Sequence, residues 1–220
     1  MIQELIECHP NIYKELSDGQ HRTIEVYIWD NLVSTNRKTI DLLFHENIIS
    51  VIDFIIFIAF LGFDKNHIEY IENKYNIDIK DYVNKYGISP HLIFPLYSAC
   101  RGQQESVARM LIERNANVAM ETADGHTALW ISSWTGNTTI ISLLIEEMKR
   151  TPDEDTIRYI INKCDITDSA PLRNAVKLGY NKAVELMLDS AEIKMADRHG
   201  NTLLHLAVSD NNLHCVKMLK

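Results

Sequence analysis

The chain of 220 residues lacks the positive charge that nucleic-acid binding requires. It carries 22 Lys and Arg residues against 30 Asp and Glu residues, for a formal net charge of −8 at pH 7. A protein that binds the phosphate backbone needs a basic face, so we expect no nucleic-acid partner. Signatures of catalysis are also missing, among them the Walker loop, the nucleophile elbow, the zinc-protease helix motif and the dinucleotide-binding glycines. We therefore expect no enzyme and no cofactor.

Cysteine is scarce and shows no paired spacing. The four residues Cys8, Cys100, Cys164 and Cys215 are scattered along the chain. A disulfide framework of the secreted type places cysteines in pairs, so we expect reduced, mostly buried thiols in a cytoplasmic protein. The opening residues Met1–Glu7 are acidic and lack the basic start of a secretory leader. If the protein is a secreted effector, we expect it in the cytosol of a host cell.

A long uninterrupted apolar run is absent as well. The most apolar stretch, Ile48–Phe63, has sixteen residues and contains Asp53. A membrane-spanning helix needs roughly twenty apolar residues. We therefore expect a buried helix here and no membrane span, with insertion into a membrane as the alternative.

What the chain does contain is an internal repeat. Similar segments occur at Pro95–Cys100, Gly125–Trp130, Ala170–Ala175 and Asp197–Ala207. One leucine occupies the same position in each segment, at intervals of 33, 43 and 32 residues: Leu96, Leu129, Leu172 and Leu204. We expect Leu129, Leu172 and Leu204 to be buried. Repetition at a near-fixed interval indicates a stacked architecture.

Each copy has the features of two helices preceded by a tight turn. In the second copy, Gly125 permits the turn, and the Thr127 hydroxyl can cap the helix that follows. Small residues such as Ser132 let this helix lie close to its neighbour. Apolar residues at helical spacing within 140–145 then mark a second helix. One such unit cannot bury its apolar face alone, so the copies must stack.

A period near 33 built on a Thr-Pro-Leu-His-x-Ala theme resembles the ankyrin repeat. The resemblance covers about residues 86–220 and implies an all-α ankyrin-repeat solenoid of helix-turn-helix units with short hairpin tips. It also implies a concave surface that binds a protein partner without catalysis. The expected repeats span about 86–118, 119–164 with an insertion near 146–156, 165–196, and 197–220, the last one truncated.

The copies depart from the family pattern in three ways. Asp168 stands where the hairpin glycine belongs, so we expect that hairpin to be distorted. Trp130 and Arg173 stand where the family usually has histidine, and we expect Trp130 to line the core. The long interval contains a helix-start signal at 151–154, with a proline at the first helical position. We expect the outer helix to break after Arg150 and to restart at that proline, projecting acidic residues.

Outside the repeats the sequence predicts less. Residues 1–85 indicate a helical N-terminal cap or small helical domain, with helical stretches at Thr23–Leu32 and Lys38–Phe44 and an option of one degenerate capping repeat from about residue 50. Lys220 falls inside the last outer helix with no polar capping repeat after it, so we expect a fragment of a longer protein. The abundance of Ile, Asn, Lys and Tyr fits ankyrin proteins of intracellular bacteria or large DNA viruses, and also of protists and insects.

A metal site is one reading of the C-terminal end, where His199, His205, His214 and Cys215 lie close in sequence. His205 is explained by the resemblance, since the family's histidine hydrogen-bonds neighbouring backbone, and His214 is expected on the outer helix. We therefore expect no metal. The adjacent pair Cys8 and His9 carries no catalytic signal either, because catalytic pairs are neighbours in space.

The candidate binding surface centres on Trp134. It lies four residues after Trp130, on the same helical face, in a position that faces the concave groove in ankyrin repeats. It is either a half-buried packing residue or a binding anchor of the kind that dominates interface energetics. Further positions resemble the family's binding positions, and the whole set is Glu121, Asp124, His126, Trp134, Thr135, Ser169, Lys177, Arg198, His199, Asn201, Ser209 and Asp210.

Two classes of function follow. The first is a non-enzymatic interaction module. The second is the recruiting or regulatory part of an enzyme or secreted effector, with catalysis in the N-terminal region or beyond residue 220. A weaker third reading makes the repeats the cytosolic part of a membrane protein. The partner's identity and the oligomeric state are not predicted.

Overall fold

The computed structural model describes residues 50–62, 65–87, 91–150 and 154–220. Within these ranges the regular elements are helices, and the one β feature is an isolated bridge between Ala196 and Thr202. The expected all-α fold is therefore confirmed. The elements are α5 (Val51–Leu61), α6 (Lys65–Tyr75), η2 (Ile79–Asp81), α7 (Pro95–Arg101), α8 (Glu105–Glu113), α9 (Ala128–Thr135), α10 (Thr138–Arg150), α11 (Glu154–Asn162), α12 (Pro171–Lys177), α13 (Asn181–Met187), η3 (Leu188–Ser190), α14 (Leu203–Ser209) and α15 (Leu213–Met218).

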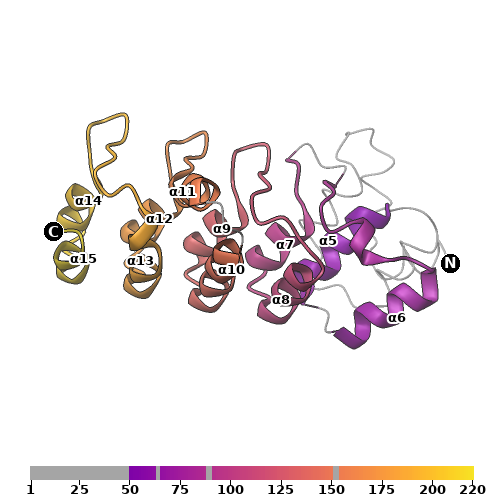
Figure 1. Ribbon diagram of the computed structural model, residues 1–220. Coiled ribbons are helices and arrows are strands. Elements are labelled where there is room, and N and C mark those ends of the chain that lie inside the picture. The colour runs from indigo at the N-terminus through magenta and orange to yellow at the C-terminus, as the bar shows by residue number, and fades with distance from the viewer. Residues whose placement is uncertain (1–49, 63–64, 88–90, 151–153) are drawn as a thin grey trace, which may run out of the picture.

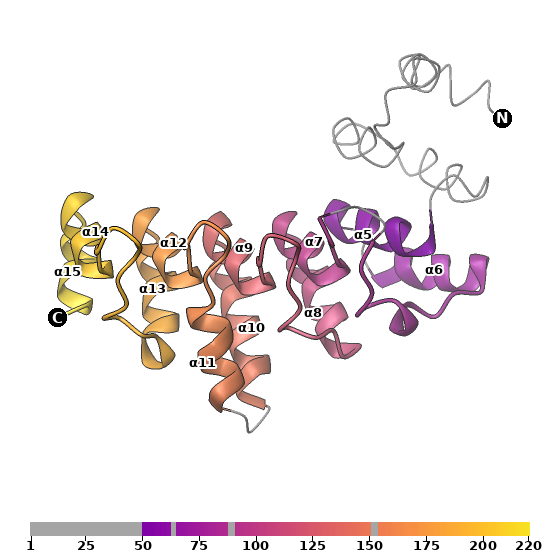
Figure 2. The same ribbon diagram turned by 90° about the horizontal axis from the view of Figure 1, so that it is seen from above.

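The helices form an elongated stack of pairs. Helices α7, α9, α12 and α14 form one row in which each contacts the next. Helices α8, α10, α13 and α15 form a second row, and each packs against its partner in the first. Figure 1 shows the loops between pairs projecting side by side from one edge of the stack, and Figure 2 shows the pairs following one another from N to C terminus. In Figure 1 the first row lies nearer to these loops than the second row does.

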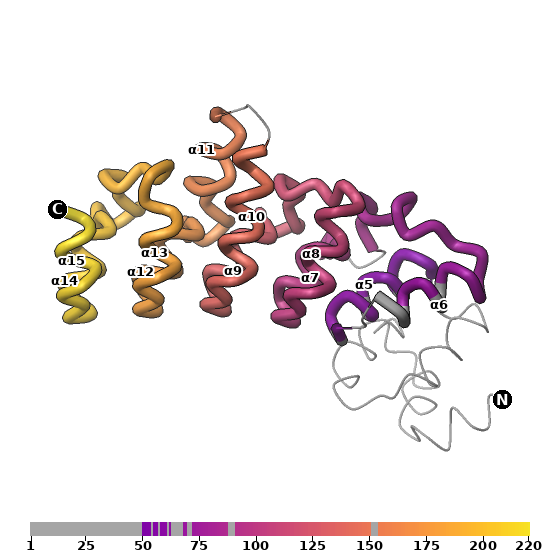
Figure 3. Tube along the Cα trace, turned by 60° about the horizontal axis from the view of Figure 1, so that its bottom comes forward, coloured from indigo at the N-terminus to yellow at the C-terminus, as the bar shows by residue number. Residues whose placement is uncertain are grey.

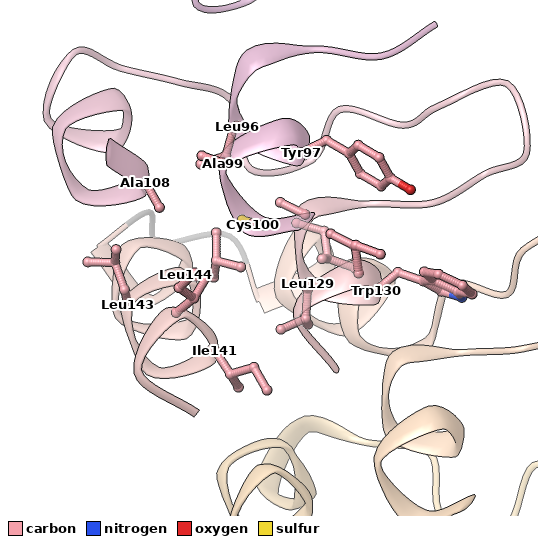
Figure 4. Close-up of a cluster of buried hydrophobic side chains, with 14 of the residues drawn as sticks. Leu96, Tyr97, Ala99, Cys100, Ala108, Leu129, Trp130, Ile141, Leu143 and Leu144 are labelled. Carbon is pink, nitrogen blue, oxygen red and sulfur yellow. The ribbon is translucent and has the colours of Figure 1, made fainter. Parts of the chain in front are cut away.

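The core lies between the two rows. Leu96 and Leu129 are buried where the first-row helices meet, and Ala99, at the neighbouring contact, has no exposed surface. Figure 4 shows these side chains together with Ile141 and Leu144 of α10. Small side chains at positions such as Ala99 allow close approach of the helices, while the leucines fill the space between rows. Burial of this kind supplies the main stabilising term in a solenoid.

The prediction of a buried leucine is wrong at the last repeat. Leu172 is buried, whereas Leu204 of α14 is only partly buried and its neighbour Leu203 is buried instead. In the earlier repeats, the first-row helix that carries the equivalent leucine is followed by another first-row helix, which it contacts. Since α14 is the last helix of its row among the described residues, Leu204 has no such helix to pack against.

The prediction of a distorted hairpin at Asp168 is also wrong. Its φ is 70°, close to the 80° of Gly125 and the 81° of Gly200 at the corresponding positions. The turn closes in the same way, because the Asp168 N–H donates to the Asp165 carbonyl at 3.1 Å and the Gly200 N–H donates to the Asp197 carbonyl at 2.8 Å. Asp and Asn tolerate left-handed backbone better than most residues, so this hairpin keeps the geometry of the others.

Neighbouring hairpin tips are joined by hydrogen bonds. The Ile166 N–H donates to the Asp124 carbonyl at 3.1 Å. At the next step the acceptor is a side chain, since the Arg198 N–H donates to Asp168 Oδ2 at 2.8 Å. Asp168 therefore both takes the backbone geometry of glycine and links its hairpin to the following one.

The insertion forms an additional helix. Helix α10 ends at Arg150, as expected, while the expected restart at the proline of Thr151–Asp153 lies outside the described residues. Helix α11 lies beside α10, and the two project beyond the neighbouring helices (Figures 2 and 3). Its apolar face, including Ile157 and Ile160, is buried, and its first residues Glu154 and Asp155 are exposed. The second row is therefore thickened at this repeat.

The N-terminal described segment adds one more layer. Helix α5 packs against α7, and Ile55, Ile56 and Ile58 are buried. Its N-terminus is capped by Ser50, whose hydroxyl accepts the Asp53 N–H. No helix of the described residues is long and apolar enough to cross a membrane. The expected helices within 1–49, together with Cys8 and His9, lie outside the described residues.

Candidate protein-binding groove

A groove with a volume of about 550 Å³ lies between the first-row helices and the hairpin loops. Helix α9, helix α12 and the loops that precede α12 and α14 supply most of its walls. Its lining comprises aromatic, charged and small polar side chains: His126, Trp130, Trp134, Thr167, Asp168, Ser169, Arg173, Asn174, Lys177, Asp197, Arg198, His199 and Leu206.

A column of stacked rings forms one side of the groove. The His126 and Trp130 rings are 3.7 Å apart between centroids, and Trp130 and Trp134 are 5.7 Å apart with planes only 4° from parallel. Tyr97 of α7 stacks on the other face of His126 at 6.5 Å. The i, i+4 spacing of the two tryptophans in α9 produces this parallel arrangement. Trp134 thus ends a column that begins in the preceding repeat.

The two tryptophans differ in burial. Trp130 is 8% exposed, which agrees with its expected place in the core, and its Nε1 donates to the Ser169 carbonyl at 2.8 Å. Trp134 is 46% exposed. Trp130 therefore links α9 to the next hairpin through a hydrogen bond. Trp134 stacks on Trp130, and about half of its indole remains accessible.

Hydrogen bonds to the Asp165 carboxylate fix the His126 end of the ring column. His126 Nε2 lies 3.2 Å from Oδ2 of the buried Asp165. The other oxygen of Asp165 accepts the backbone N–H groups of Thr167 and Ser169, each at 2.8 Å. This carboxylate organises the hairpin and holds the histidine ring in the stack.

Two ion pairs cross the groove. Arg173 Nη1 lies 3.3 Å from Asp197 Oδ2, and Arg198 Nε lies 4.0 Å from Asp168 Oδ2. The Asn201 backbone N–H, assisted by that of His199 and by Arg173, holds the pKa of Asp197 below its usual range. Both groove carboxylates are therefore already engaged by arginine.

Two side chains of the groove lining, Lys177 and Asn174, have a hydrogen-bond donor without an acceptor among the described residues. Lys177, at the end of α12, is exposed and makes no ion pair or hydrogen bond with any described residue. Asn174 is buried, and although its Oδ1 accepts the Ser169 hydroxyl at 2.6 Å, its Nδ2 has no hydrogen-bond partner among the described residues. Lys177 is therefore the accessible unpaired donor of α12, while the Asn174 Nδ2 atom is enclosed in the protein.

Half of the residues predicted from sequence line this groove, namely His126, Trp134, Ser169, Lys177, Arg198 and His199. The others lie elsewhere: Glu121 binds Lys163 at 3.2 Å and the Tyr159 hydroxyl at 2.7 Å beside α11, and Asp124, Thr135, Asn201, Ser209 and Asp210 do not line the groove.

Sequence reasoning did not assign Trp130, Thr167, Asp168, Arg173, Asn174, Asp197 or Leu206 to the surface. Three of them, Trp130, Asp168 and Arg173, depart from the family pattern, and this departure is the sequence signal that could have identified them.

Three of the residues that suggested a metal site, His205, His214 and Cys215, have separate partners. His205 Nδ1 accepts the Thr202 N–H at 3.1 Å, and the Thr202 hydroxyl caps the same helix, as the resemblance implied. His214 Nε2 lies 3.3 Å from Glu185 Oε1. Cys215 Sγ lies 3.1 Å from Asn181 Oδ1. Across the described ranges, no group of three or more His, Cys, Asp or Glu side chains could hold a metal ion.

Residues 148–220 match the family model "Ankyrin repeats (3 copies)". Among curated proteins, the chain is similar to human transient receptor potential cation channel subfamily A member 1, with 25% identity over 136 residues, which are 57% of this chain and 12% of that protein. It is also similar to human Rabankyrin-5, with 28% identity over 127 residues, which are 57% of this chain and 10% of that protein. The chain thus matches about a tenth of the length of each relative.

Proposed function

Because the chain carries ankyrin repeats, a general protein-interaction module, we propose that it binds a protein partner in the groove centred on Trp134. The exposed indole of Trp134 carries the proposal. An aromatic ring of this size gains free energy when a partner removes it from water, and aromatic anchors dominate interface energetics. Stacking on Trp130 holds the ring in place before binding, which lowers the entropy cost of binding.

The groove around Trp134 has the composition of an interface. Charged and polar side chains such as Lys177, Arg198 and His199 surround the indole. A polar rim around an apolar centre is typical of protein–protein contacts. We assign no catalytic role to the repeats, which are a non-catalytic interaction fold, and we extend that assignment to the whole chain.

Substitution of Trp134 tests the proposal. Partners captured with the wild-type chain are purified and titrated against Trp134→Ala and, as a matched control, Tyr159→Ala on α11. The two side chains have nearly equal exposure, 46% and 48%. We expect Trp134→Ala to weaken binding by about 2 kcal/mol or more with a nearly unchanged melting curve, and Tyr159→Ala to bind normally.

Other outcomes decide between specific alternatives. If Trp134→Ala unfolds the chain, Trp134 is a packing residue and the groove proposal fails. If Tyr159→Ala weakens binding while Trp134→Ala does not, the interface lies on the inserted helix α11.

We further propose that the protein works in a reducing compartment such as the cytoplasm. Cys100, Cys164 and Cys215 are free thiols, and Cys100 and Cys215 are buried. Burial raises the pKa of the Cys100 thiol to about 12, so this thiol stays protonated and unreactive at physiological pH. Mass spectrometry of the protein isolated from cells would contradict this placement if it found these cysteines in disulfides.

A further inference from the structure

The charges of the groove differ in sign from the charge of the chain. The chain as a whole carries a formal charge of −8. The groove lining contains three side chains that are always cationic, Arg173, Lys177 and Arg198, but only two carboxylates, Asp168 and Asp197. The groove is thus a locally basic surface on an acidic protein.

The ion pairs of the groove leave one cationic side chain unpaired. Asp197 is bound by Arg173 at 3.3 Å, and Asp168 accepts the Arg198 N–H at 2.8 Å with the guanidinium at 4.0 Å. Lys177 has no partner among the described residues. The positive charge available to a ligand is therefore that of the Lys177 ammonium at the C-terminal end of α12.

The acidic groups of the groove do not compensate this charge. The two groove carboxylates are already engaged by arginine, and a carboxylate is the strongest acceptor among protein side chains. Asn174, one helical turn before Lys177, also has an Nδ2 atom without a hydrogen-bond partner among the described residues, but that atom is buried and out of reach of a bound segment. The accessible unpaired donor on α12 is thus the Lys177 ammonium.

The apolar part of the groove adds a second requirement. Trp134 exposes one face of a stacked indole, and Leu206 of α14 lies in the same lining. A flat aromatic surface beside an unpaired ammonium suits a segment that places an apolar side chain near an acidic one.

We propose that the groove binds an acidic peptide segment of its partner, with an Asp or Glu carboxylate on Lys177 and an apolar side chain on Trp134. This inference rests on the proposed function and specifies the class of partner. The charge complementarity raises the rate of encounter, and the indole contact supplies the anchor that slows dissociation.

Selection from a random-peptide phage library on the full chain tests the inference. We expect the enriched peptides to combine Asp or Glu with an aromatic or aliphatic residue, and their binding to weaken as salt rises. Enrichment of basic peptides, of neutral peptides alone, or of no peptide would overturn the inference.

Charge reversal then locates the contact. The most enriched peptide, synthesised with a fluorescent label, is titrated against Lys177→Glu and Lys217→Glu. Both variants change the net charge equally, but Lys217 is exposed on α15, outside the groove lining. We expect Lys177→Glu to weaken binding at least about fivefold and Lys217→Glu to have little effect. Equal effects would overturn the inference, because they would mean that net charge alone matters.

The same peptide separates this inference from the proposed function. If non-acidic peptides are selected and lose binding to Trp134→Ala, the groove is a binding surface and only the acidic preference fails. If peptides are selected, acidic or not, but bind Trp134→Ala as tightly as wild type, the groove proposal fails and this inference fails with it.

Discussion

Asp168 does at one hairpin tip what glycine does at two others. Its φ of 70° lies in the left-handed region, where a side chain costs about 1–2 kcal/mol in most residues. Its carboxylate accepts the Arg198 N–H of the following hairpin at 2.8 Å. The position therefore combines a backbone cost with a side-chain gain that glycine cannot offer.

Substitutions at Asp168 separate these two contributions. We expect Asp168→Ala to lower the free energy of unfolding by about 1–2 kcal/mol, since Ala tolerates the left-handed backbone less well than Asp and loses the hydrogen bond. Asp168→Gly loses the same bond without the strain, so it should be less harmful. Urea denaturation of the two variants checks this order. Equal losses for Ala and Gly would mean that the left-handed backbone costs nothing here.

At this scale, sequence reasoning succeeded where a residue's neighbours are local. The resemblance to the ankyrin repeat implied the place of Trp130 in the core and the backbone hydrogen bond of His205. The ion pair of Arg173 with Asp197 joins residues of different repeats. The sequence gives no rule for which oppositely charged side chains of adjacent hairpins face each other, so this pair was not predicted.

Among the helices, the first-row leucines show why the repeat forms. Leu129 is 1% exposed and Leu172 is 3% exposed, each between its own pair of helices and a neighbouring pair. Leu204 is only partly buried. The repeated position thus has a graded environment along the stack, set by how many helices surround it.

Truncation of these leucines should follow that gradient. We expect Leu129→Ala and Leu172→Ala to cost roughly 2–5 kcal/mol, because each leaves a cavity in the core, and Leu204→Ala to cost less. Lys149→Ala and Glu154→Ala, on exposed sites, serve as controls and should be nearly neutral. Chemical denaturation of all five variants checks the series. Comparable losses at core and exposed positions would contradict the packing described.

The sequence predicted a helix in the α11 region but not where that helix packs. The interval of 43 residues and the helix-start signal at 151–154 predicted that the outer helix breaks after Arg150 and restarts. The sequence did not predict that this helix lies back along α10 and also contacts α12. That arrangement depends on the direction of the connection, and apolar spacing carries no information about it.

For the whole molecule, the repeat period predicted the stack and with it the existence of a concave side. It did not predict which side chains line the groove, because the lining depends on how loops of successive repeats are placed against one another. Trp134 was the exception, since a fixed position within the repeat faces the groove. The groove therefore combines a position set by the family with charges particular to this chain, such as Lys177 and Arg198.

Hydroxyl-radical footprinting with a bound partner tests the central claim most directly. Trp134 and Tyr159 are reactive aromatic side chains of nearly equal exposure, 46% and 48%, in the groove and on α11 respectively. The account predicts that oxidation of Trp134 falls sharply on partner binding while oxidation of Tyr159 is unchanged. Unchanged oxidation of Trp134 in a saturated complex would contradict the assignment of the groove as the binding surface.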